Sequence, residues 1–220
     1  MHKTVQNLIN IQDLIKSKQS VLKNDKLNPK IIAVSKTFSI DHIKPLIDFG
    51  HMHFGENKVQ EAKEKWEKMK IENKNIILHM VGKLQSNKVK HALKIFDYIH
   101  SLDNEKLAEK LAKEQINLNK NPKIFIQVNI GGEDQKSGIN KNHLSSFYEF
   151  CLKLNLNIIG LMCIPPNDNR SGKFFSEIKK LALNLNLNEI SMGMSNDYIQ
   201  AVENNATFLR IGSSIFGQRN

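Results

Sequence analysis

Short apolar runs alternate with longer amphipathic stretches through most of the sequence, and this alternation restricts the fold more than any other feature. Eight runs are short and apolar enough for buried strands: residues 30–35, 52–55, 75–82, 96–101, 123–130, 157–164, 188–193 and 207–214. The stretches between them carry apolar residues at helical spacing: residues 40–49, 57–70, 86–94, 103–117, 141–153, 172–184 and 196–204. Strands separated by helices pair in parallel through right-handed crossovers. Eight such units closed on themselves predict a TIM-type (β/α)8 barrel.

An extra helix is expected before the first strand, because apolar residues recur at roughly helical spacing within residues 4–23. A chain of 220 residues is long enough for one barrel, so we expect a single domain over residues 1–220. A doubly wound open sheet is the alternative fold. No glycine-rich dinucleotide fingerprint follows the first apolar run, which disfavours that alternative. The only loop that resembles a linker is "PPNDNRSGK" at residues 165–173.

Pro45 conflicts locally with this pattern. It lies inside the predicted helix at residues 40–49, for which Ser39 is the expected cap. A proline beyond the first turn removes a backbone hydrogen bond. We therefore expect this helix to be kinked or to start late.

Composition narrows the class of protein. Lys and Arg number 32 against 22 Asp and Glu, a formal net charge of +10. The lysines are interleaved with glutamates along predicted helices, as in "EAKEKWEKMK", which is typical of a solvated helix face rather than a nucleic-acid site. Cys151 and Cys163 have no metal-ligand spacing and are expected to be buried thiols. No apolar segment suits a secretory signal or a membrane span, so we expect a cytoplasmic protein without a membrane partner.

Lys36 ends the first apolar run, "IIAVSKTF", and is the first candidate site residue. Chemistry in a TIM-type barrel gathers at the carboxyl ends of the strands. If Lys36 points into the barrel, strand alternation places Ile32 and Val34 on the same face and Ser35 on the helix side. Desolvation at the barrel mouth lowers the pKa of a lysine, which favours the amine that a Schiff base needs. The alternative is that Lys36 only ends the strand and reaches into water.

The loops after the last two strands resemble a phosphate site. "SMGMSND" contributes Ser195, and "RIGSS" contributes Gly212 and Ser213 with Arg210 just before them. Barrels often bind phosphate at this place through backbone N–H groups and hydroxyls. Turns and caps alone would also explain such small residues. A lysine on the first strand beside a phosphate pocket on the last suggests a phosphorylated aldehyde, pyridoxal 5'-phosphate (PLP).

The order of motifs resembles one known family. They are "AVSKTF", "HFGENKVQEA", "HMVGKLQSNKVK", "IHSLD", "IQVNIGGEDQKSGI", "GLMCIPP", "SMGMSND" and "RIGSSIFGQR". Together these segments resemble the YggS-type pyridoxal phosphate homeostasis proteins from about residue 30 to the C-terminus. The resemblance implies a barrel related to the N-terminal domain of alanine racemase that holds PLP as a Schiff base.

The resemblance also implies a role for each cofactor-binding residue. It implies no metal ligand. Lys36 matches the Schiff-base lysine, and Asn57 matches an asparagine near the cofactor ring or its O3' side. Ser195, Gly212 and Ser213 match the phosphate-binding segments, and Arg210 matches an arginine close to the phosphate. His79 and Trp66 are interpreted as core residues.

Three functions remain to be compared. The resemblance favours a PLP carrier or regulator in vitamin B6 homeostasis, with PLP and PLP-dependent apoenzymes as candidate partners. A PLP-dependent amino-acid racemase is the alternative, but racemisation needs two bases on opposite faces of the ring. In the related racemases the second base comes from a following domain, which we do not expect here, so we assign no catalytic residue. A nucleic-acid binder is the third option. We expect a monomer, because a closed barrel has no sheet edge, with at most a weak racemase-like side activity.

Overall fold

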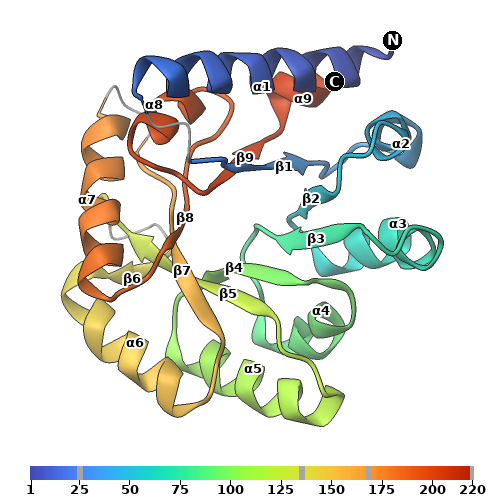
Figure 1. Cartoon of the computed structure of the whole chain (residues 1–220). Helices are drawn as coiled ribbons and strands as arrows, with labels where there is room; N and C mark the ends of the chain where they lie inside the picture. Colours follow the sequence, from blue (N-terminus) through green and yellow to red (C-terminus); the bar gives the residue numbers. More distant parts are fainter. Residues whose placement is uncertain (24–26, 134–136, 167–169, 219–220) are drawn as a thin grey trace.

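Eight parallel strands form a closed barrel in the computed structural model, which describes residues 1–23, 27–133, 137–166 and 170–218 (Figure 1). The barrel strands are β1 (Lys30–Val34), β2 (His53–Glu56), β3 (Ile77–Met80), β4 (Tyr98–Leu102), β5 (Lys123–Asn129), β7 (Ile158–Cys163), β8 (Glu189–Ser191) and β9 (Phe208–Ile211). They pair in chain order, and the pairing of β9 with β1 closes the ring. The predicted TIM-type barrel is confirmed.

A ninth strand, β6 (Ile139–Asn140), was not predicted. It pairs in parallel with the end of β5, where Val128 lies opposite Ile139 and Asn129 opposite Asn140. Two residues are too few for a detectable alternation, and this is why the sequence pattern missed the strand. Residues 134–136, within the same connection, and residues 167–169 of the expected linker-like loop lie outside the described residues.

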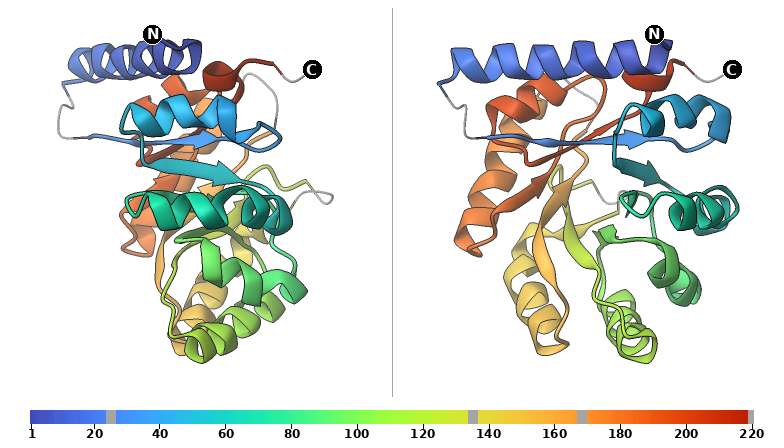
Figure 2. Two further views of the ribbon diagram at one scale, coloured as in Figure 1. Left: turned by 90° about the vertical axis from the view of Figure 1, so that its right-hand side faces the viewer. Right: turned by 45° about the vertical axis from the view of Figure 1, so that its right-hand side comes forward.

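Helices surround the barrel in all three views of Figures 1 and 2. They are α1 (Lys3–Val21), α2 (Ile40–Asp48), α3 (Val59–Glu72), α4 (Val89–Ile95), α5 (Glu105–Leu118), α6 (Leu144–Lys153), α7 (Ser171–Asn184), α8 (Tyr198–Glu203) and α9 (Ser213–Phe216), with 3-10 turns at Ser86–Lys88 and Lys141–His143. Within the described ranges, none of these helices is long and apolar enough to cross a membrane.

The extra N-terminal helix is confirmed and packs beside α9, the short helix that follows the last barrel strand. α1 packs against α2, α8 and α9, and so covers the outside of β1 and β9. Leu8, Ile11 and Ile15 are buried on its inner face. Asn7 on the same helix donates a hydrogen bond to the Ile215 carbonyl of α9 at 2.9 Å. The short α9 therefore needs α1 to complete the helical layer.

The helix that contains Pro45 starts at Ile40 and continues through the proline, so of the kink or late start expected from the sequence, the late start did not occur. Ser39 is the N-cap residue, but its hydroxyl contacts His42 Nδ1 at 3.0 Å and makes no capping hydrogen bond to the backbone. Ile43 and Leu46 on this helix are fully buried. Their burial against the barrel offsets the hydrogen bond that the proline removes.

Two apolar layers hold the barrel. The inner layer fills the barrel itself and consists of Ile32, Val34, Tyr98, Phe125, Met162 and Phe208. The outer layer, between strands and helices, includes Ile31 and Ala33 of β1. The alternation predicted for β1 is therefore confirmed. Cys151 and Cys163 are free and buried as expected, and burial raises the pKa of both thiols to about 12.

Two glycines give opposite expectations for stability. A Cβ on Gly160 of β7 would lie 1.9 Å from the Glu189 carbonyl oxygen of the neighbouring strand, whereas a Cβ on Gly172 of α7 would meet no atom within 4 Å. Gly160→Ala should lower the free energy of unfolding by about 1–3 kcal/mol through overpacking. Gly172→Ala should leave it unchanged or raise it by up to about 1 kcal/mol. Urea unfolding measures both, and equal effects would contradict this account of the β7–β8 contact.

Candidate functional site

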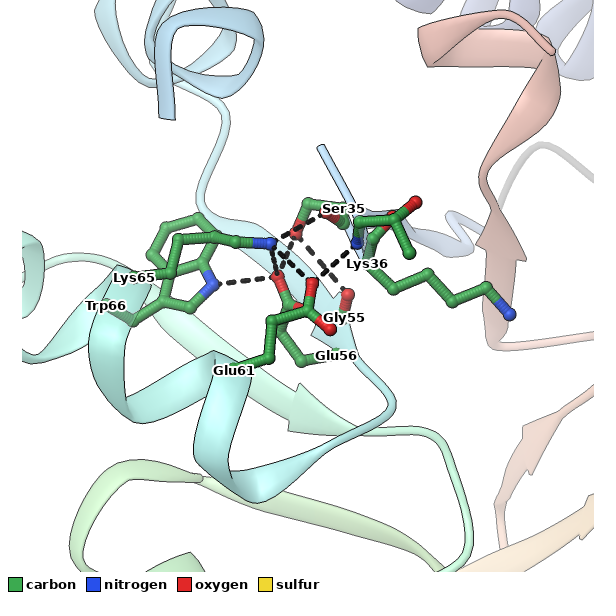
Figure 3. A network of polar contacts seen from close by, with 8 residues as sticks. Ser35, Lys36, Gly55, Glu56, Glu61, Lys65 and Trp66 are labelled. Carbon is green, nitrogen blue, oxygen red and sulfur yellow. Dashed lines mark hydrogen bonds and ion pairs between the residues drawn. The ribbon is translucent and has the colours of Figure 1, made fainter. Parts of the chain in front are cut away.

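Lys36 lies two residues beyond Val34, the last residue of β1, at the carboxyl end of the barrel. Val34 faces the barrel interior, so the same alternation directs Lys36 toward the barrel mouth. Ser35 faces the opposite side, where its hydroxyl donates a hydrogen bond to Glu56 Oε1 at 2.8 Å. In Figure 3 the Lys36 side chain extends away from Lys65 and Trp66. The lysine is half-buried, and the lowered pKa expected for it stays a prediction.

Strand register brings the other candidate residues to both sides of Lys36. On one side Val34 lies opposite Gly55, so Asn57, two residues further, reaches the level of Lys36. On the other side Ala33 lies opposite Ile211, the residue before Gly212. The distance between Val34 O and a Cβ built on Gly212 would be only 3.4 Å. The end of β9 therefore approaches β1 closely, directly below Lys36.

The two predicted phosphate loops are joined to each other. The Ser214 backbone N–H donates to Ser195 Oγ at 3.2 Å, and the Ser214 hydroxyl donates to the Ser195 carbonyl at 3.5 Å. Beside them lies a hollow of about 310 Å³. It is lined by Val34, Phe38, Gly212, Ser213, Gly217 and Gln218. Small residues, a hydroxyl and an open space of this size fit a phosphate group.

Asn57 faces a second hollow of about 490 Å³, between the ends of β2 and β3. Lys58, Lys83 and Lys88 also line it. A Cβ on Gly82 would lie 2.5 Å from the Asn57 carbonyl oxygen, so the glycine permits the β3 loop to pack on Asn57. The structure thus places Asn57 and the serine loops in separate hollows, with Lys36 between the strands that bear them.

Arg210 lies inside the barrel rather than on its surface. Its guanidinium donates hydrogen bonds to Ser191 Oγ at 2.7 Å and to the Cys163 carbonyl at 2.8 Å. Burial lowers the pKa of Arg210 from its ordinary value. Phe208 points inward two residues earlier and Gly212 follows two residues later, so Arg210 lies between the apolar layer and the phosphate loops. Its expected contact with a phosphate stays a prediction.

A chain of hydrogen-bonded side chains runs from Arg210 through the barrel interior. Ser191 Oγ is 2.9 Å from His100 Nδ1, His100 Nε2 is 3.0 Å from His79 Nδ1, and His79 Nε2 is 3.0 Å from His53 Nδ1. His79 and His100 are fully buried. Each of these two rings has a partner at both nitrogens, so His79 is a satisfied core residue as interpreted from the sequence.

Burial lowers the pKa of all three histidines in this hydrogen-bonded series, His53, His79 and His100. The pKa values of His79 and His100 fall well below 6.5, chiefly by desolvation, and the charge of Arg210 adds to the effect at His100. The pKa of His53 falls to about 4, chiefly by desolvation, with His51, Lys30 and Lys123 contributing and Asp97 opposing. The histidines are therefore neutral at pH 7 and can connect Arg210 to the opposite end of the barrel without adding charge.

Of these three histidines, only His79 was identified from the sequence as a residue to consider. The missed signal was alternation, because inward-facing histidines occur on three successive predicted strands, in "MHFG", "IILHMVG" and "DYIHS". Trp66 is a core residue, as interpreted from the sequence. Trp66 is fully buried, and its Nε1 donates to Glu56 Oε1 at 2.9 Å. In the described part of the chain no cluster of His, Cys, Asp and Glu side chains is arranged to hold a metal ion.

Comparisons with known proteins identify the family of this chain. The family described as "Alanine racemase, N-terminal domain" matches residues 7–220. The pyridoxal phosphate homeostasis protein of Vibrio cholerae is 36% identical, and the match covers 100% of this chain and 98% of that protein. The homologue of the same name from Aquifex aeolicus is also 36% identical, with 86% of this chain and 87% of that protein covered.

Solved structures of other proteins share the fold of this chain. PipY of Synechococcus elongatus, solved with PLP bound, is 34% identical with a TM-score of 0.81 and covers 92% of this chain and 100% of its own. Alanine racemase of Clostridium difficile shares the fold alone, with 13% identity and a TM-score of 0.74 over 99% of this chain and 57% of its own.

The fold and the site define a (β/α)8 barrel with a lysine after its first strand and small polar loops after its last two. Among proteins with this barrel, the chain belongs to the pyridoxal phosphate homeostasis protein family, which the family resemblance predicted.

The histidine chain predicts how stability changes with pH. An unfolded histidine has a pKa near 6.5, so below this value the unfolded chain binds more protons than the folded one. The free energy of unfolding should therefore fall from pH 6.5 toward pH 4, by at most about 1.4 kcal/mol per pH unit for each histidine.

Urea unfolding at several pH values tests this with two variants. His53→Asn should reduce the slope of the free energy of unfolding against pH by the equivalent of up to one bound proton. His91→Asn, at an exposed position on α4, should leave this slope unchanged. Equal slopes for the wild-type protein and His53→Asn would contradict the neutral state assigned to the buried chain.

Proposed function

We propose that this protein binds PLP through Lys36 and takes part in intracellular vitamin B6 homeostasis as a carrier or regulator. The observation that carries the proposal is the position of Lys36 at the barrel mouth, with Asn57 just after the strand on one side and Gly212 just after the strand on the other. The family and the PLP-bound relative PipY support it. We further propose that residues 1–220 act as one PLP-binding domain.

Each candidate residue has a definite task in this proposal. When bound, PLP would supply an aldehyde that reacts with an amine. Its ring would withdraw electrons from the group attached there. Lys36 Nζ provides the amine. Ser195, Gly212 and Ser213 bind the phosphate through hydroxyl and backbone N–H groups, and Asn57 contacts the ring side. Arg210, held by Ser191 and Cys163, adds fixed positive charge below the phosphate loops.

A carrier needs fewer groups than a racemase. Racemisation requires a second base on the ring face opposite the lysine. The likeness to alanine racemase is one of fold. We therefore propose a carrier that keeps the aldehyde away from other amines, and the racemase is the alternative.

Removing the Lys36 amine should abolish covalent PLP binding. We expect the wild-type protein to gain an absorption band between 300 and 500 nm on titration with PLP, after subtraction of the spectrum of free PLP, and Lys36→Ala to gain none while keeping its circular dichroism. Lys106→Ala, at an exposed position on α5, is the matched control and should titrate like the wild type. An unchanged band in Lys36→Ala would refute the assignment.

The phosphate loops should provide much of the affinity. Ser195→Ala removes a hydroxyl that also joins the two loops, so the Kd for PLP should rise about tenfold, a change of about 1.4 kcal/mol. Pyridoxal, which lacks the phosphate, should bind wild type and variant equally weakly in the same titration. A Ser195→Ala protein that discriminates PLP from pyridoxal as well as wild type does would show that the phosphate lies elsewhere.

Racemase activity toward alanine distinguishes a carrier from a racemase. The carrier proposal predicts no conversion of L-alanine to D-alanine at ordinary enzymatic rates, measured by chiral chromatography with PLP present. Rapid conversion that depends on Lys36 would favour the racemase. Delivery to apoenzymes, the monomeric state and the cytoplasmic location stay predictions from the sequence.

A further inference from the structure

The peptide groups on both sides of Lys36 are held by one helix, α3. Lys65 Nζ donates to the Ser35 carbonyl at 3.0 Å, immediately before Lys36. The Thr37 N–H, immediately after Lys36, donates to Glu61 Oε1 at 2.6 Å. Glu61 and Lys65 form an ion pair one helical turn apart, with 3.0 Å between Nζ and Oε1. Two side chains of α3 thus hold the backbone from which the Lys36 side chain departs.

Lys65 lies at the centre of this arrangement, and all the hydrogen-bond donors of its ammonium group have acceptors. Lys65 Nζ also contacts Glu56 Oε1 at 3.0 Å, so its three N–H groups match three acceptors (Figure 3). Its side chain is 10% exposed, and that of Glu56 is 0% exposed. Water screens such a pair little. By contrast, the ion pair of Lys68 with Glu72 on the same helix is 87% and 51% exposed.

Thr37 adopts a backbone conformation that requires such support. Its φ is 68°, in the left-handed region that β-branched residues rarely occupy. A conformation of this kind persists where the surroundings determine it. The acceptor on Glu61 is the contact that binds the Thr37 N–H in this conformation. The backbone direction at Lys36 therefore depends on Glu61, which lies 24 positions after Thr37 in the sequence.

We propose that Glu61 and Lys65 are positioning residues for Lys36, which fix the direction in which its amine enters the barrel mouth. The proposal rests on the function proposed above, because the amine matters only if PLP binds there. Neither residue lines the hollow beside the phosphate loops. Their effect passes through the backbone at Ser35 and Thr37. A lysine whose direction is not fixed presents its amine to a bound aldehyde less often.

Binding experiments on four variants test the proposal. Glu61→Ala and Lys65→Met should each raise the Kd for PLP and slow formation of the absorption band by about tenfold. Glu61→Gln, which keeps an oxygen acceptor for the Thr37 N–H, should restore most of the loss. Lys68→Met, which changes the same residue type on the exposed face of α3, is the matched control and should bind like wild type.

A second readout needs no PLP. Amide hydrogen exchange at Thr37, measured by NMR in the apo protein, should become several-fold faster in Glu61→Ala and stay unchanged in Lys68→Met. Glycine adopts a positive φ without strain. In a Thr37→Gly background, Glu61→Ala should therefore weaken PLP binding by about twofold rather than tenfold.

The outcomes separate this proposal from the function on which it rests. A wild-type protein that gains no band with PLP overturns the proposed function, and faster Thr37 exchange would still support the α3 contacts as backbone positioning. Normal PLP binding by the wild type together with unchanged affinity and exchange in Glu61→Ala overturns the positioning role. Loss of binding in Glu61→Ala with unchanged Thr37 exchange also overturns it, because the effect would not pass through the backbone.

Discussion

The parallel pairing of β1 with both β2 and β9 is the constraint on which the site depends. It closes the barrel, and the same register places Asn57 and Gly212 on opposite sides of the segment that carries Lys36. No single segment of the chain contains this arrangement, since its parts come from the first, second and last barrel strands. Ring closure brings together residues separated by more than 150 positions.

The barrel interior combines an apolar layer with a polar column. Phe125 and Phe208 pack against the rings of His79 and His100, so the histidines lie in an aromatic environment. A buried charge without partners would be costly. Arg210 avoids this cost through Ser191 and the Cys163 carbonyl, and the neutral histidines extend the hydrogen bonding further. Beneath the site, the side chains of Arg210, Ser191, His100 and His79 thus form a buried, hydrogen-bonded layer.

Alternation and order of elements were sufficient to predict the barrel and the orientation of β1, because both depend on local patterns of burial. Lys36 and the serine loops were found because they end strands. Glu61 and Lys65 could not be assigned a role in the same way, since their partners are backbone groups of Ser35 and Thr37 on another element. Their spacing of four residues indicates a helical ion pair and nothing more. The left-handed backbone of Thr37 also has no signature in its residue type.

The proposed function requires that PLP attaches to the amine of Lys36. The most direct measurement is borohydride reduction of the PLP-loaded protein, followed by mass mapping of its peptides. We expect the reduced cofactor to be found on the peptide that contains Lys36 and on no other lysine in stoichiometric amount. Label on a different lysine, or no label despite excess PLP, would contradict the assignment of Lys36 and the function built on it.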